Sequence, residues 1–121
     1  MKRKIAVTTG TRAEFGLLRP VLEEISNNKK LQLFILASGM HLSKKFGSTI
    51  QEITNEGFEI SGRIKMVPRN DTNYDMAISL GQGIIGFSKI FKKIKPDINL
   101  VLGDRDEALA SSLAAYHMNI V

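Results

Sequence analysis

Two short charged segments carry the residue types that could do chemistry, and each follows an apolar run. The first is residues 10–16, GTRAEFG, and the second is residues 103–107, GDRDE. A guanidinium can pair two oxygens of an anion at once, and a carboxylate can hold a hydroxyl or move a proton. Together the two segments indicate a site for an anionic substrate that undergoes acid–base chemistry.

The first segment matches neither of the two common phosphate-binding motifs. A dinucleotide fingerprint would need glycine at Arg12, and a P-loop would need Gly-Lys at positions 15 and 16. We predict a different kind of anion-binding site, in which Gly10 permits a tight turn, Arg12 pairs with the anion and the next helix offers its N-terminal N–H groups. The alternative is that Arg12 only bridges to a nearby carboxylate such as Asp104 or Glu14.

Asp104 has two interpretations that the sequence leaves open. Asp104 and Glu107 have the D-x-x-E spacing of a capping box, in which the aspartate covers N–H groups of the following helix. A carboxylate at the carboxyl end of a strand can also hold a sugar hydroxyl or act as a base. Capping excludes neither of these roles.

His41, in the segment GMHL at residues 39–42, is a further candidate because an imidazole that titrates near neutrality suits proton transfer. The competing interpretation is a histidine bonded to a neighbouring loop. The chain has no cysteine, which excludes a thiol nucleophile, a disulfide scaffold and a cysteine-based metal centre. We predict no metal site and no cofactor.

One segment imitates a cofactor-binding motif. Residues 81–86, GQGIIG, match G-x-G-x-x-G, and Asp104 follows about 20 residues later, as in a dinucleotide-binding unit. The apolar stripe over residues 76–94 nevertheless crosses these glycines without changing phase, whereas the true motif lies where a strand ends and a helix begins. We predict that the glycines permit close helix packing, and a dinucleotide-binding module at Gly81 to Gly86 is the alternative.

Short apolar strands alternate with helices along the chain. The predicted strands are residues 4–9, 31–38, 58–64 and 98–102, and the predicted helices are residues 14–27, 48–56, 76–94 and 107–117. Pro20 is expected to kink or restart the first helix, and the polar residues 66–75 are expected to form a loop that serves a site.

This alternation predicts a single Rossmann-like α/β domain over residues 1–121, with a parallel sheet and helices on both faces. Ligands of such sheets bind beyond the carboxyl ends of the strands, at the crevice between the first and fourth strands. Both charged segments lie at these strand ends, so we expect Arg12 and Asp104 to line one pocket.

Composition narrows the class of protein. The net charge is +5, from 17 basic and 12 acidic residues, but the basic residues stand in scattered groups without interleaved aromatic residues, so nucleic-acid binding is not predicted. These groups are Lys2, Arg3 and Lys4; Lys29 and Lys30; Lys44 and Lys45; and Lys92, Lys93 and Lys95. The apolar runs are too short for a membrane span or a secretory signal, so we expect a cytoplasmic protein with no membrane partner.

The segments GTRAEFG, GMHL and GDRDE, in this order, closely resemble the N-terminal part of hydrolysing UDP-N-acetylglucosamine 2-epimerases of the sialic-acid-pathway type. The likeness covers essentially the whole chain but only the first part of such an enzyme. It implies an incomplete N-terminal domain of a two-domain, glycosyltransferase-B-like enzyme, whose C-terminal domain, absent here, holds most of the UDP. It also implies a homo-oligomer at full length and an isolated chain without activity.

The same resemblance implies roles for the candidate residues. Asp104 is implied to be a catalytic carboxylate in the sugar pocket, with His41 nearby in a weaker catalytic role, and Arg12 is implied to lie near the diphosphate. The implied substrate-binding residues are Gly10, Arg12, Glu14 and Arg105.

The implied reaction begins with departure of UDP from UDP-N-acetylglucosamine, because the positive charge that develops at C1 acidifies the proton at C2. A base then removes that proton to give a glycal. Water adds with the opposite stereochemistry to release N-acetylmannosamine and UDP, for sialic-acid-type sugar synthesis. No cofactor is needed, and UDP-diacetylbacillosamine is the alternative substrate.

Overall fold

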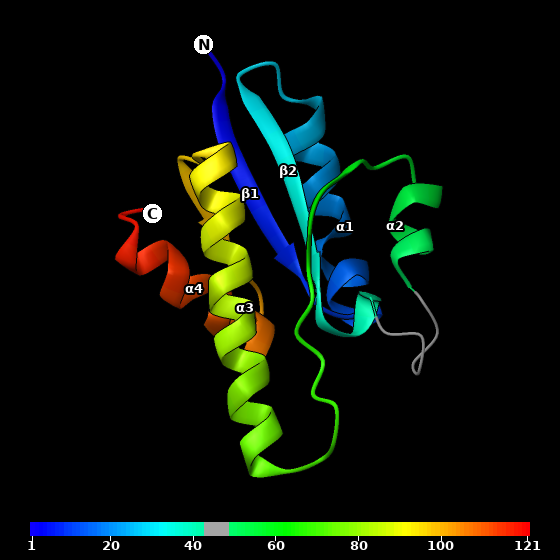
Figure 1. The fold of residues 1–121 in the computed structure, drawn as a ribbon. Coiled ribbons are helices and arrows are strands. Elements are labelled where there is room, and N and C mark those ends of the chain that lie inside the picture. Colours follow the sequence, from blue (N-terminus) through cyan, green and yellow to red (C-terminus); the bar gives the residue numbers. More distant parts are fainter. Residues whose placement is uncertain (43–48) are drawn as a thin grey trace.

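Four parallel strands form one sheet in the computed structural model, which describes residues 1–42 and 49–121 (Figure 1). The strands are β1 (Arg3–Thr9), β2 (Leu31–Ser38), β3 (Ile60–Ile64) and β4 (Ile98–Leu100). They lie in the order β3-β2-β1-β4, and every neighbouring pair is parallel. The chain steps outward from β1 to β3 and then returns to the other side of β1, so the strand order reverses between β1 and β4, as predicted.

Helices connect the strands. They are α1 (Arg12–Asn27), α2 (Ile50–Asn55), α3 (Asn73–Ile94) and α4 (Asp106–His117), with a short 3-10 turn, η1 (Gly39–Leu42), after β2. Each predicted helix is therefore present with shifted ends. Part of the predicted second helix, Ser48, lies outside the described residues, as do Lys44 and Lys45.

The helices cover both faces of the sheet, because side chains alternate along each strand. On one face Ala6 and Leu36 pack with residues of α3 and α4, including Phe87. On the other face Val7 and Ile35 pack against α1 and α2. The prediction of a Rossmann-like layout with helices on both faces is confirmed.

Three local expectations need correction. The helix α1 runs through Pro20 as one element, without a fresh start, and it begins at Arg12 rather than at residue 14. The predicted loop over residues 66–75 ends earlier, because the side chain of Thr72 accepts a hydrogen bond from the N–H of Asp75 and α3 begins at Asn73. Strand β4 ends at Leu100 rather than at residue 102.

The glycines of residues 81–86 lie inside α3, so they do not form the strand-to-helix turn of a dinucleotide fingerprint. A Cβ atom at Gly83 would lie 2.7 Å from Met66 Sδ, and one at Gly86 would lie 2.8 Å from Ile64 Cγ2. Gly81 has no such neighbour. Close packing therefore explains two of the three glycines.

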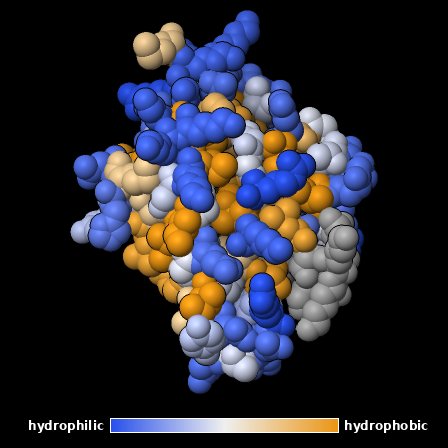
Figure 2. All heavy atoms as spheres, viewed as in Figure 1, coloured by the Kyte–Doolittle hydropathy of each residue, from blue (hydrophilic) through white to orange (hydrophobic). Residues whose placement is uncertain are grey.

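Apolar and hydrophilic residues are interspersed on the molecular face that carries α3 (Figure 2). Several apolar side chains of α3 remain partly exposed, among them Met76, Ile78 and Ile85. Within residues 1–42 and 49–121, no helix combines the length and apolarity that crossing a membrane would require.

Candidate functional site

The loop after β1 is held by a compact set of hydrogen bonds at the start of α1. Thr11 is the N-cap, and its Oγ1 accepts from the N–H of Glu14 at 3.2 Å. The carboxylate of Glu14 in turn accepts from the N–H of Gly10 at 2.8 Å. The side chain of Glu14 is therefore engaged in fixing this loop.

Gly10 is needed for a reason that its position in the sequence did not reveal. Its backbone is not among those with positive φ, so a tight turn does not require glycine here. A Cβ atom at Gly10 would instead lie 2.7 Å from Cγ of Glu107. What requires glycine here is the space that it leaves for a side chain from α4.

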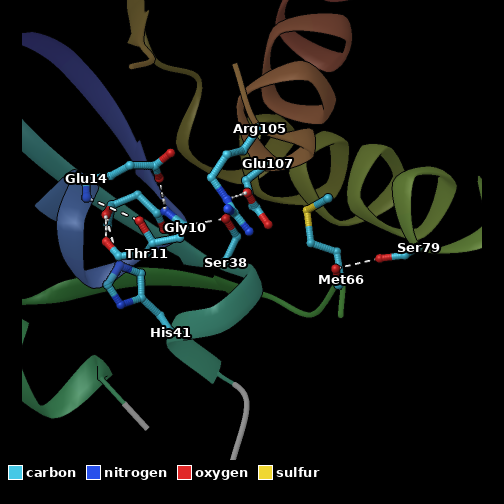
Figure 3. A network of polar contacts seen from close by, with 10 residues as sticks. Gly10, Thr11, Glu14, Ser38, His41, Met66, Ser79, Arg105 and Glu107 are labelled. Atoms are coloured by element: carbon cyan, nitrogen blue, oxygen red, sulfur yellow. Dashed lines mark hydrogen bonds and ion pairs between the residues drawn. The ribbon is translucent and has the colours of Figure 1, made fainter. Parts of the chain in front are cut away.

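Glu107 joins the ends of three elements. It is 6% exposed, and its side chain lies against Gly10, directly after β1, and Gly39, directly after β2, where φ is +59°. Its Oε2 lies 3.2 Å from Nε of Arg105. Figure 3 shows Gly10, Arg105 and Glu107 side by side at the strand ends. The buried carboxylate thereby ties the loop after β4 to those after β1 and β2.

The capping interpretation of Asp104 is wrong. Helix α4 begins at Asp106, and its N-cap residue is Arg105, whose side chain makes no capping hydrogen bond. Asp104 is exposed and lies one residue before the cap. Asp104 instead lines a surface pocket.

That pocket, of about 350 Å³, has two contrasting walls. The loop after β4 supplies the charged wall, with Asp104, Arg105 and Glu107. The chain after β3 and the first turns of α3 supply a largely apolar wall, with Met66, Val67, Pro68, Met76 and Ser79.

Arg12 lines a different pocket, of about 370 Å³, together with Phe15, Arg19 and residues of α2. Its Nε lies 3.1 Å from Oε2 of Glu52, and its side chain is 75% exposed. The predicted shared pocket of Arg12 and Asp104 is therefore wrong. The alternative, that Arg12 bridges to a nearby carboxylate, matches the structure, although the partner is Glu52 rather than Asp104 or Glu14. An ion pair this exposed stabilises by about 0–1 kcal/mol, so an anionic ligand could redirect the guanidinium at little cost.

His41 is fully buried beneath the loop after β1. Its Nε2 lies 2.9 Å from Oγ1 of Thr9, and its Nδ1 lies 2.6 Å from Oγ1 of Thr49. Burial lowers the pKa of His41 from 6.5 to about 4, and a backbone hydrogen bond with Thr11 acts weakly in the opposite direction. The expectation that this ring titrates near neutrality is wrong, and its bonding to neighbouring loops matches the competing interpretation.

Sequence reasoning missed Glu107 as the residue around which the site is built. The signal that could have found it is the pair of glycines, Gly10 and Gly39, that directly follow two neighbouring strands. Such glycines often mark a place where another part of the chain packs closely against the backbone. In the parts of the chain that the structure describes, no three His, Asp or Glu side chains gather as a metal site would require.

Comparison with known proteins adds the family context. A family model described as UDP-N-acetylglucosamine 2-epimerase matches residues 23–121. The UDP-N,N'-diacetylbacillosamine 2-epimerase (hydrolyzing) of Legionella pneumophila is 42% identical over 99% of this chain and 32% of its own length. The UDP-N-acetylglucosamine 2-epimerase of Neisseria meningitidis is 38% identical over 93% of this chain and 29% of its own length. The chain thus spans about a third of the length of these relatives.

Solved structures agree on the fold. A crystal structure of a UDP-N-acetylglucosamine 2-epimerase superposes with a TM-score of 0.83 at 23% identity, covering 100% of this chain and 32% of that one. The Neisseria meningitidis enzyme bound to UDP-GlcNAc superposes with a TM-score of 0.78 at 21% identity, covering 97% of this chain and 30% of that one. The fold is that of the N-terminal portion of these glycosyltransferase-B-like proteins. This chain belongs to the UDP-N-acetylglucosamine 2-epimerase family.

Proposed function

We propose that the whole protein catalyses hydrolysing 2-epimerisation of UDP-N-acetylglucosamine to N-acetylmannosamine and UDP. The observation that carries the proposal is the meeting of two charged loops, after β1 and after β4, at the carboxyl ends of adjacent parallel strands, where Gly10 packs on Glu107. In sheets of this kind that position is where ligands bind. Membership of the epimerase family supports the reaction class.

The chemistry follows from the weak acidity of the C2 proton in the intact sugar. When the bond from C1 to the UDP oxygen breaks, its electron pair leaves with UDP and C1 becomes electron-poor. A base can then take the C2 proton, and the electron pair of the C–H bond forms the C1–C2 double bond of a glycal. Water restores the saturated ring by adding OH at C1 and a proton at C2 on the opposite face.

Asp104 is proposed to orient the sugar or to move the C2 proton, because it is an exposed carboxylate in a pocket beside the strand ends. Arg105 lines the same pocket and is proposed to help bind the substrate. His41, Gly10 and Glu14 are proposed to act through the backbone of the β1 loop, since His41 is buried and the other two are bonded to each other.

Arg12 is proposed to stabilise the charge that grows on the leaving diphosphate. It lies in a pocket separate from that of Asp104. An extended nucleotide sugar has chemically distinct ends, so its sugar can occupy one pocket while its diphosphate reaches toward the other. The two residues are therefore proposed to contact different parts of one substrate.

A second candidate substrate is UDP-N,N'-diacetylbacillosamine. Relatives from Legionella pneumophila and Campylobacter jejuni, at 42% and 41% identity, are described as 2-epimerases of this sugar. The same elimination and hydration would apply, because the two sugars share the acetamido group at C2.

Homo-oligomerisation at full length and a cytoplasmic location stay predictions.

The test is the rate of UDP release from both nucleotide sugars by the whole protein and its variants. Arg12→Ala is expected to lower kcat by about 10²- to 10³-fold through lost charge stabilisation, and Asp104→Asn by about 10²- to 10⁴-fold through lost proton transfer. Arg3→Ala and Asp97→Asn, at the opposite ends of β1 and β4, are the matched controls. Unchanged rates in the first two variants would refute the assigned roles.

A further inference from the structure

The apolar wall of the Asp104 pocket is rigidly built. Met66 is 2% exposed and occupies the space that Gly83 leaves open on α3. Ser79, buried on the same helix, donates its hydroxyl hydrogen to the carbonyl oxygen of Met66 at 2.5 Å. Figure 3 shows this bond across the pocket from Arg105 and Glu107. The chain after β3 is thus held against α3, and Met66 forms the floor of the pocket.

The rest of the wall presents apolar side chains to a ligand. Val67 and Pro68 are half-buried beside Met66, and Met76 is 41% exposed at the rim. The hydroxyl of Ser79 already gives its hydrogen to the Met66 carbonyl. The other polar side chains that line this pocket come from residues 104–107 on the opposite wall.

This contrast would orient a sugar bound with its reacting carbon at Asp104. In a pyranose ring C5 is the atom opposite C2, and C5 carries C6, with C4 beside it. A sugar whose C2 faces the charged wall therefore turns its C4 and C6 substituents toward the apolar wall.

Building on the proposed function, we propose that Val67, Pro68 and Met76, beside the floor that Met66 forms, are specificity-determining residues that read the C4 and C6 substituents. The wall favours a 4-acetamido, 6-deoxy sugar over one with hydroxyl groups at C4 and C6. A methyl at C6 and the methyl of an acetamido group bury apolar surface there, whereas a hydroxyl loses water without gaining a partner. Methionine adapts its shape to such substituents.

The expected size of the preference follows from what an apolar pocket can discriminate. Differences of one methylene or one hydroxyl in such pockets change kcat/KM by about 10- to 200-fold. The whole protein is therefore expected to process UDP-N,N'-diacetylbacillosamine with a kcat/KM about 10- to 100-fold above that for UDP-N-acetylglucosamine.

The test compares the ratio of these two kcat/KM values among variants of the whole protein. Met76→Gln and Val67→Thr give the wall a polar group with little change in volume, and each is expected to lower the ratio by about threefold or more. Ile85→Gln is the matched control, because Ile85 is 58% exposed on the same helix and does not line the pocket. It should leave the ratio unchanged.

The outcomes separate the two proposals. A wild-type ratio near one overturns the proposal that the apolar wall determines specificity. So does a ratio that neither wall variant lowers relative to Ile85→Gln. Both outcomes leave the epimerase proposal intact. Absence of UDP release from both substrates overturns the proposed function, and with it the proposal that the apolar wall determines specificity.

Discussion

At the scale of single residues, Glu107 is the side chain around which the candidate site is organised. A carboxylate this buried is stable only when it is paired, and Arg105 supplies the charge partner at 3.2 Å. Two strand-end glycines give it room, and its place in the first turn of α4 adds the favourable end of the helix dipole. The loops that carry Asp104 and Arg12 are thereby joined through one residue, although the two side chains lie in separate pockets.

Replacing Gly10 tests this packing. Gly10→Ala is expected to lower the free energy of unfolding by about 1–3 kcal/mol, because the added Cβ would lie 2.7 Å from Glu107 Cγ. Gly16→Ala is the matched control, since nothing lies within 4 Å of its added Cβ and it sits inside α1. It is expected to stabilise the helix by about 0.5–1 kcal/mol. Denaturant unfolding midpoints measure both effects, and a Gly10→Ala protein as stable as the wild type would contradict the packing.

The lowered pKa of His41 leads us to expect that the free energy of unfolding depends on pH. Its pKa is about 4 in the folded state and 6.5 when unfolded, so the unfolded state binds the proton first as the pH falls. Stability is full above pH 6.5 and declines toward pH 4, by up to about 3 kcal/mol.

Unfolding free energies measured between pH 7 and pH 4 test this contribution. His41→Gln is expected to flatten the decline, whereas His117→Gln, at an exposed position, should leave it unchanged. A decline equally steep in wild type and His41→Gln would show that other groups produce it.

Residue types and spacing identified the two charged loops, but they could not identify side-chain partners. Arg12 pairs with Glu52, which lies in α2 forty positions along the chain, whereas Glu14, two positions away, accepts a hydrogen bond from Gly10. Asp104 has the spacing of a cap, yet the helix starts two residues later. Such choices depend on how distant elements dock, which local patterns do not encode.

At the scale of elements, apolar periodicity predicted the four strands and four α-helices that the structure describes, because these elements place apolar side chains in the two cores, but it did not predict the short η1. Strand β1 alternates between the two cores, and α3 keeps its stripe through its glycines. The residues at which the helices begin and end were less predictable, since they depend on single residues. For α3 these are the N-cap Thr72 and Lys95, which has a left-handed backbone before Pro96.

The glycines of α3 give an element-scale prediction. Gly83→Ala is expected to displace Met66, because its Cβ would lie 2.7 Å from Sδ and 3.1 Å from Ala110 Cβ, and to destabilise by about 1–3 kcal/mol. Gly81→Ala, in open space two residues earlier, is expected to stabilise by about 0.5–1 kcal/mol. Thermal unfolding of the two variants distinguishes them, and similar shifts in Tm would contradict a packing role for Gly83.

At the scale of the whole molecule, we propose that residues 1–121 provide one wall of a site. The pockets that Asp104 and Arg12 line are open to solvent, where electrostatic stabilisation of a leaving diphosphate is weak. The isolated 121 residues are therefore expected to show no UDP release above the uncatalysed rate, whereas the whole protein releases UDP. A coupled assay for UDP measures both, and turnover by the isolated chain would contradict the need for a second wall.

The account as a whole is tested most directly by the reaction in D₂O. Elimination and rehydration predict that the whole protein releases UDP and a 2-epimerised sugar carrying one deuterium at C2, detected by NMR or mass spectrometry. Asp104→Asn is expected to suppress deuterium incorporation and UDP release together, while Asp97→Asn preserves both. A product that keeps its original C2 proton, or an Asp104→Asn protein that exchanges it at the wild-type rate, would contradict the account.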